Sequence, residues 1–130
     1  MPLPNGAGGY QFSDGNVGEP LLVVQTTPTA LTAAATLTAA QLGVGLFTYN
    51  GAAANLTLPT VADLEAYVSS AEKVDVAFDF WIINTGANTA TLVVGTGWTI
   101  VGAAGTATAT SSGWRARKTG VGAWTCYRIS

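Results

Sequence analysis

The most constraining feature of the sequence is the stretch Val74–Gly102, which reads as consecutive β-strands joined by tight turns. The even-numbered residues 74–82 are all apolar (Val, Val, Phe, Phe, Ile), whereas the odd-numbered residues 75–79 are Asp, Ala and Asp. This period-two alternation predicts a strand with one buried face. At Trp81 and Ile83 the outer face becomes apolar too, which predicts that this end of the strand is covered on both sides, as in a sandwich.

The rest of the chain repeats this pattern in short segments. Residues 44–49 and 54–58 read as two strands joined by a hairpin-type turn at Asn50-Gly51. With the alternating segments near the C-terminus, the chain gives eight or nine short strands. We therefore expect an all-β protein, a single β-sandwich or jelly-roll-like domain with one short helix and an extended N-terminal arm.

The helix is expected directly after residue 60, where Thr60 is a typical N-cap and Asp63 stands at the capping-box position. Its predicted apolar face consists of Val61, Leu64, Tyr67 and Val68. The segment Leu37–Leu42 is expected to form only a single helical turn, capped by Thr38 with Gln41 three residues on and ended by Gly43.

Residues 1–35 differ from the remainder, because closely spaced Gly and Pro break any regular element in their first part. We interpret 1–35 as an extended arm and linker and 36–130 as the β-sandwich domain. A loop wrapped over its own core is the less favoured alternative, and residues 25–35 are either an edge strand or a linker. The apolar residues expected to anchor the arm on a neighbour are Tyr10, Phe12, Leu21, Leu22, Val23 and Val24.

Charged residues are sparse, at 9% of the chain with a net charge of −2, where about a quarter is usual. Either copies of the protein or a larger assembly cover much of the surface, or threonine hydroxyls keep it soluble. Acidic residues cluster in 63–79 and basic ones in 115–128, and these groups could pair within the fold or between subunits. Since there is no dense basic tract and no apolar stretch of membrane-spanning length, we expect neither nucleic-acid nor membrane binding.

Residues for catalysis or metal binding are not found in the sequence. There is no histidine and a single cysteine, which argues against ordinary zinc sites and against histidine-dependent nucleophiles. Asp75 and Asp79 share a strand face but lie roughly 13 Å apart, too far for a glycosidase pair. Cys126 is expected to be a small core residue. We therefore expect a non-enzymatic protein with no catalytic residue, cofactor or metal.

Aromatic and basic residues remain as candidates for binding. The four tryptophans, at 81, 98, 114 and 124, all lie in strand-like segments. Core packing is favoured over a sugar-binding role for them. Arg115 and Arg117 are expected to face outward, either as a surface for an acidic partner or as an ordinary solvated face.

Several phrases, spread over nearly the whole chain, carry a resemblance to a known family. They are residues 1–16 (MPLPNGAGGYQFSDGN), 37–42 (LTAAQL), 56–60 (LTLPT), 78–86 (FDFWIINTG), 95–102 (GTGWTIVG), 114–120 (WRARKTG) and 124–130 (WTCYRIS). Together they resemble small structural proteins of tailed-bacteriophage particles, above all head decoration (cement) proteins. None of these phrases is a catalytic fingerprint.

The resemblance implies a virion structural protein that decorates and stabilises the outer capsid surface by bridging neighbouring shell subunits. Its implied partners are the major capsid protein and itself, with a trimer favoured over a dimer. Assembly would take place in the bacterial host cytoplasm. The arm residues named above, together with Arg115 and Arg117, are the predicted contacts. The alternative is a tail-fibre or receptor-binding β-module that recognises host surface glycans.

Overall fold

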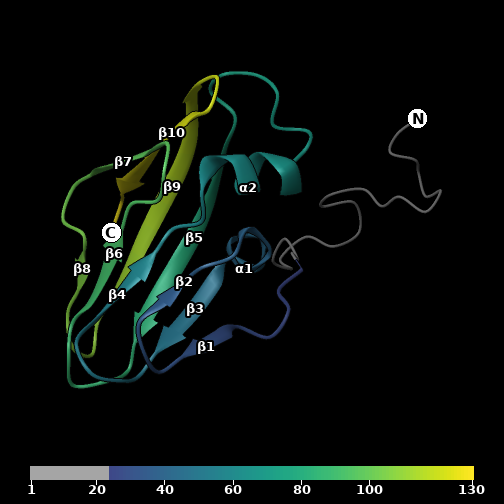
Figure 1. The fold of residues 1–130 in the computed structure, drawn as a ribbon. Helices are drawn as coiled ribbons and strands as arrows, with labels where there is room; N and C mark the ends of the chain where they lie inside the picture. The colour runs from purple at the N-terminus through teal and green to yellow at the C-terminus, as the bar shows by residue number, and fades with distance from the viewer. Residues whose placement is uncertain (1–23) are drawn as a thin grey trace, which may run out of the picture.

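The computed structural model describes residues 24–130, in which two sheets enclose one core and the strands alternate between them until the last two, which share one sheet (Figure 1). The larger sheet contains, in spatial order, β1 (Thr29–Leu31), β3 (Leu46–Tyr49), β5 (Ala77–Asn84), β9 (Ser111–Gly120), β10 (Ala123–Arg128) and β7 (Trp98–Val101). The smaller sheet contains β2 (Ala35–Thr36), β4 (Ala54–Thr57), β6 (Ala90–Val93) and β8 (Gly105–Thr106). The described chain is thus a β-rich domain, and β1 matches the edge-strand alternative for residues 25–35.

The first six strands wind as a stack of parallel turns. β1, β3 and β5 are parallel in the larger sheet, and β2, β4 and β6 are parallel in the smaller one. In this register Phe47 lies between Thr29 and Ile82, residues that are far apart in the sequence. Within the described residues, antiparallel pairing is confined to β5–β9, β9–β10 and β6–β8. Parallel neighbours require a crossover connection, and here the crossover passes through the other sheet.

The hairpin expected across Asn50-Gly51 is wrong, because β3 and β4 belong to different sheets. The turn instead connects the two sheets, and it packs against the preceding connection between them, at Leu31 and Thr32. Asn50 N donates to the Leu31 carbonyl at 3.0 Å, and a Cβ at Gly51 would lie 2.1 Å from the Thr32 carbonyl oxygen. Glycine is therefore required at residue 51 by this close backbone approach and not by hairpin geometry.

Two helices, not one, occur in residues 24–130, and each carries the chain from the smaller sheet back to the larger one. α1 (Ala39–Val44) has the predicted reciprocal capping box between Thr38 and Gln41, but it ends at Gly45, whose φ is 84°, rather than at Gly43. α2 (Val61–Tyr67) begins at the predicted cap Thr60. Figure 1 shows the two helices side by side at one edge of the molecule.

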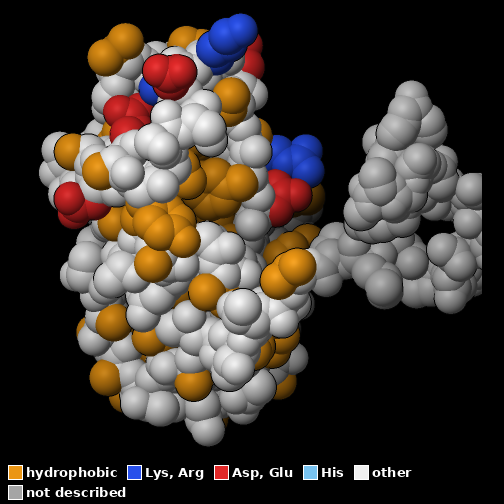
Figure 2. All heavy atoms as spheres, turned by 90° about the vertical axis from the view of Figure 1, so that its right-hand side faces the viewer, with side chains coloured by type: hydrophobic (Ala, Val, Ile, Leu, Met, Phe, Trp, Pro, Cys, Tyr) orange, Lys and Arg blue, Asp and Glu red, His pale blue; other side chains and the backbone are white. Residues whose placement is uncertain are grey.

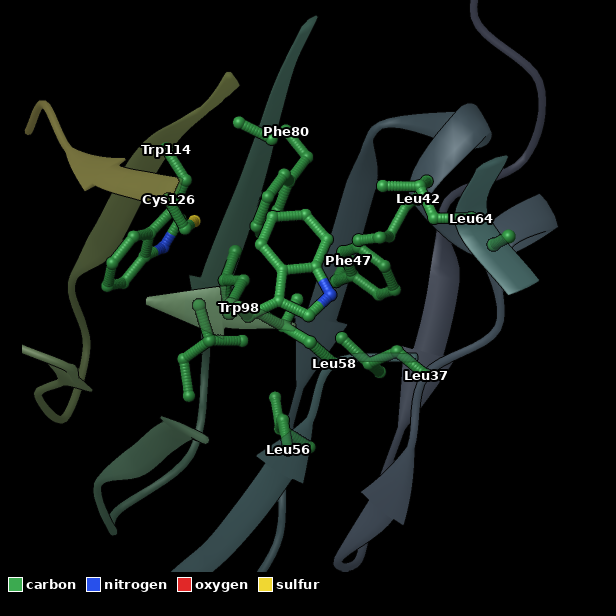
Figure 3. Packing of buried hydrophobic residues seen from close by; sticks show 14 of the residues in the cluster. Leu37, Leu42, Phe47, Leu56, Leu58, Leu64, Phe80, Trp98, Trp114 and Cys126 are labelled. Carbon is green, nitrogen blue, oxygen red and sulfur yellow. The ribbon is translucent and has the colours of Figure 1, made fainter. Parts of the chain in front are cut away.

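The core lies between the sheets and under the helices (Figure 3). Trp98, Trp114 and Trp124 are buried, as predicted. The indole nitrogen of Trp98 donates to the Pro59 carbonyl at 2.7 Å, so its one polar atom is satisfied inside the core. The predicted helix face is confirmed for Val61 and Leu64 but is wrong for Tyr67, which is 55% exposed.

A buried polar cluster connects the two sheets by hydrogen bonds at the C-terminal end of β5. Asn84 at the end of β5 donates to the carbonyls of Asn88 at 2.6 Å and Thr106 at 2.9 Å. The Thr106 and Ser112 hydroxyls, one from each sheet, lie 2.7 Å apart. Because every one of these groups has a partner, the cluster fixes the relative position of β5, β8 and β9 without an unsatisfied polar atom.

Candidate functional site

The exposed face of the six-stranded sheet is the candidate site. β5 turns Phe80 and Ile82 inward and Asp79 and Trp81 outward. β9 continues the same alternation, so the predicted outward orientation of Arg115 is confirmed. The pleat therefore places alternate residues of β5, β9 and β10 on one open surface.

Trp81 occupies the middle of this face. The sequence pattern predicts that it is covered on both sides, but 44% of it is exposed, and the nearby Ile83 is 37% exposed. Trp81 is the register partner of Gly113 on β9. A Cβ at Gly113 would lie 2.4 Å from the indole ring, so the ring lies across the glycine backbone. The missing side chain at residue 113 thus makes room for a flat, solvent-facing indole.

Beside Trp81 the next row of residues carries charge. Arg115 Nε and Nη2 donate to the two carboxylate oxygens of Asp79 at 2.7 and 2.9 Å, a bidentate pair between register partners. These hydrogen bonds lower the pKa of Asp79 and raise that of Arg115. Arg117 Nε donates to Asp75 at 3.1 Å, and its Nη1 donates to the Tyr127 hydroxyl at 2.7 Å.

In the Asp79–Arg115 and Asp75–Arg117 pairs, the acidic and basic segments of the sequence therefore pair within the fold. Asp75, whose φ is 79°, lies in a bend just before β5, which begins at Ala77. Val74, which the alternation predicts on the buried strand face, precedes this bend and is 50% exposed. Exposed pairs of this kind contribute little to the stability of a fold. Since each pair joins one cation to one anion, the two pairs add no net charge to the face.

Aliphatic side chains complete the face. Val101 on β7 lies in register with Tyr127, and Ile129 N donates to the Gly113 carbonyl at 2.8 Å, beside the indole. Val101 is 49% and Ile129 54% exposed. An exposed apolar group surrounded by Trp, Tyr and Arg is typical of the residues that dominate protein–protein binding.

A third ion pair lies inside the fold and has a structural role. Lys118 on β9 points inward, 3.0 Å from Glu65 on α2, and donates to the Ala71 carbonyl at 2.9 Å. The indole nitrogen of Trp124 donates to the same carboxylate at 3.1 Å. These hydrogen bonds lower the pKa of Glu65, that from Lys118 most. Through these contacts, Lys118 and Trp124 hold α2 and the loop that follows it against the larger sheet.

Two other features could in principle bind a ligand or react: a groove and a buried thiol. The groove, of about 530 Å³, lies where both helices begin, and its lining includes five threonines and one acidic residue, Asp63. Cys126 is fully buried, and burial raises its pKa to about 12, which leaves the thiol unreactive at neutral pH. Within the described part of the chain, no group of three side chains could ligate a metal.

The predicted contacts divide into two groups. Tyr10, Phe12 and Leu21–Val23 lie outside the described residues, and Val24, which begins the described chain, is 92% exposed. Arg115 and Arg117 are brought together with Trp81, which the sequence pattern assigns to the core. The signal for its exposure is its odd-numbered position, on the same face as Asp79.

Charge is unevenly spread over the surface. In the view of Figure 2 the charged side chains lie in the upper half, whereas the lower half shows only hydrophobic and neutral groups. The same asymmetry exists in the sequence, where no charged residue occurs from residue 20 to residue 62. Among the helices of residues 24–130, none has the length and apolar character needed to cross a membrane.

Comparisons with family models, with curated proteins and with solved structures give no match for this chain.

Proposed function

We propose that this protein is a non-enzymatic structural component of a tailed-phage virion that decorates the outer capsid and bridges neighbouring shell subunits. The observation that carries the proposal is the open sheet face around Trp81, whose exposed indole and neighbouring arginines are of the residue types that dominate protein–protein binding. The resemblance of the sequence to phage decoration proteins supplies the assembly in which that contact would be made. The major capsid protein and further copies of the chain are the proposed partners.

We also propose that the two sheets form a β-sandwich, because buried side chains from both sheets share one core. The jelly-roll form is not favoured, since a jelly roll consists of antiparallel Greek keys and five of the eight strand pairings in residues 24–130 are parallel. In this proposal the N-terminal residues 1–24 add contacts to the shell from outside the sandwich.

The proposal is tested by locating the protein on intact particles with cryo-microscopy or gold-labelled antibody. Regularly spaced density over the head is the expected result. Purified particles that lack the protein would refute a virion role. A variant without residues 2–23 should keep the melting temperature of the full chain yet no longer saturate the shell, and unchanged occupancy would remove the arm from the proposal.

A second candidate function, glycan recognition by a tail-fibre or receptor-binding module, is favoured by the flat exposed ring of Trp81. Indole faces stack on sugar rings, and the adjacent Asp79–Arg115 pair could hydrogen-bond hydroxyls. This candidate predicts saturable binding to host cells that is lost in Trp81→Ala. It also predicts antibody label at the tail tip rather than over the head.

A further inference from the structure

We infer that the open face of the six-stranded sheet is where a second copy of this chain packs, face to face, about a two-fold axis. The axis runs along the strands, midway between β5 and β9. The inference deepens the proposed function by naming the partner of this face. Its test needs only purified protein, so it can fail while a virion location stands, and the reverse also holds.

The order of charges on the face is complementary to itself under this rotation. Asp79 on β5 and Arg115 on β9 are register partners, at the same height along the strands. A half-turn about the proposed axis exchanges β5 with β9, so Asp79 of each copy faces Arg115 of the other. Arg115 uses Nε and Nη2 for its own Asp79, which leaves Nη1 for the second carboxylate, and a carboxylate can accept more than two hydrogen bonds.

The same axis also matches the apolar row. Trp81 and Gly113 are register partners on the same two strands, so the rotation places Trp81 of each copy opposite Gly113 of the other, with the two indoles side by side across the axis. Because residue 113 has no side chain, the two rings can lie flat between the sheets. Ile83 and Ile129, both exposed, flank the rings. An aromatic centre with adjacent arginines is the usual arrangement of an interface hot spot.

The area of the face suits a dimer of moderate strength. Six strands spaced about 4.8 Å apart span about 29 Å, and the outward residues from Ala77 to Ile83 span about 20 Å along β5. The flat area is about 580 Å² per copy, or about 1,200 Å² in total, which is the lower limit for stable protein interfaces. Sheets that pack face to face lie about 10 Å apart, enough for the indoles and guanidinium groups.

Two charge reversals test this arrangement. In an Asp79→Arg dimer four cations would meet, and in an Arg115→Asp dimer four carboxylates would meet, so each variant alone should be monomeric. In an equimolar mixture the arginine introduced in one chain would face the aspartate introduced in the other, and the dimer should return. Because the Asp79 and Arg115 side chains are both well exposed, loss of their ion pair costs little stability, so both variants should remain folded, which circular dichroism verifies.

The measurements are sedimentation equilibrium between about 1 and 100 µM, where interfaces of this size can dissociate, and native mass spectrometry of the mixture. We expect a monomer–dimer equilibrium for the natural chain and a one-to-one heterodimer for the mixture. Glu72→Arg, the same charge reversal off this face, should leave the dimer intact. Trp81→Ala, which does not depend on the charges, should raise the dimer Kd about 30-fold or more.

Three results would overturn the inference. The natural chain could remain monomeric at the highest concentration. It could form a trimer, which a single two-fold interface cannot build. The two charge variants could stay monomeric when mixed, which would show that Asp79 and Arg115 do not face each other across the interface.

Discussion

Replacing Lys118 with methionine tests whether the internal ion pair holds α2 on the sheet. The lysine is 8% exposed, and its ammonium donates to the Ala71 carbonyl and pairs with Glu65. Methionine keeps the length and apolar stem of the side chain but removes both interactions. Breaking a fully buried pair costs about 3–5 kcal/mol.

The loss should be smaller here, because the Glu65 side chain is 27% exposed and can be rehydrated. We expect Lys118→Met to lower the free energy of unfolding by about 2 kcal/mol. That corresponds to a fall in melting temperature of about 8 °C for a domain of this size.

The assay is urea unfolding followed by tryptophan fluorescence, with the double variant Lys118→Met/Glu65→Gln as the matched control. Glutamine still accepts the Trp124 N–H but carries no charge, so the double variant should recover part of the lost stability. A loss below about 0.5 kcal/mol, the range of ordinary surface substitutions, would refute the reasoning. A double variant that is less stable than Lys118→Met would do the same.

The pair also predicts a dependence on pH. The pKa of Glu65 is lower in the folded protein than its ordinary value, chiefly because Lys118 donates to it. The stabilisation is therefore present above the unfolded pKa of about 4.3 and is lost as the pH falls from there through the folded pKa. Glu65→Gln should lose less stability than the natural chain between about pH 5 and pH 3, as urea midpoints would measure.

Other substitutions test separate features of the fold. Gly113→Ala should displace the Trp81 ring, because a Cβ there would lie 2.4 Å from it; increased acrylamide quenching would verify this, and an unchanged emission spectrum and quenching would contradict it. Ala109→Gly should stabilise the protein by about 0.5–1 kcal/mol in thermal unfolding, since residue 109 has φ 57° and glycine tolerates that backbone; a lower melting temperature would contradict this. Cys126, buried with its pKa raised to about 12, should react with a thiol reagent only in denaturant; labelling of the native protein at about pH 8 would show that the core opens.

Local features of this protein follow from the sequence alone. The alternation in β5 and β9 gives which residues face the core, because successive side chains in a strand point to opposite faces in any sheet. The caps at Thr38 and Thr60 follow from bonds to residues only three positions away. Because side chains alternate along β9, the sequence also correctly predicts that Trp114 is buried and that Arg115 faces outward.

The tertiary structure alone decides which strands are neighbours. Side-chain alternation is identical in parallel and antiparallel sheets, so Asn50-Gly51 could equally close a hairpin or form a corner between sheets. The corner is selected by contacts with distant segments, at Leu31 and Thr32. The exposure of Trp81 likewise depends on Gly113, 32 positions later, and on the absence of a third layer over the six-stranded sheet within residues 24–130. Such pairings join residues that are far apart in the chain, and no local pattern encodes them.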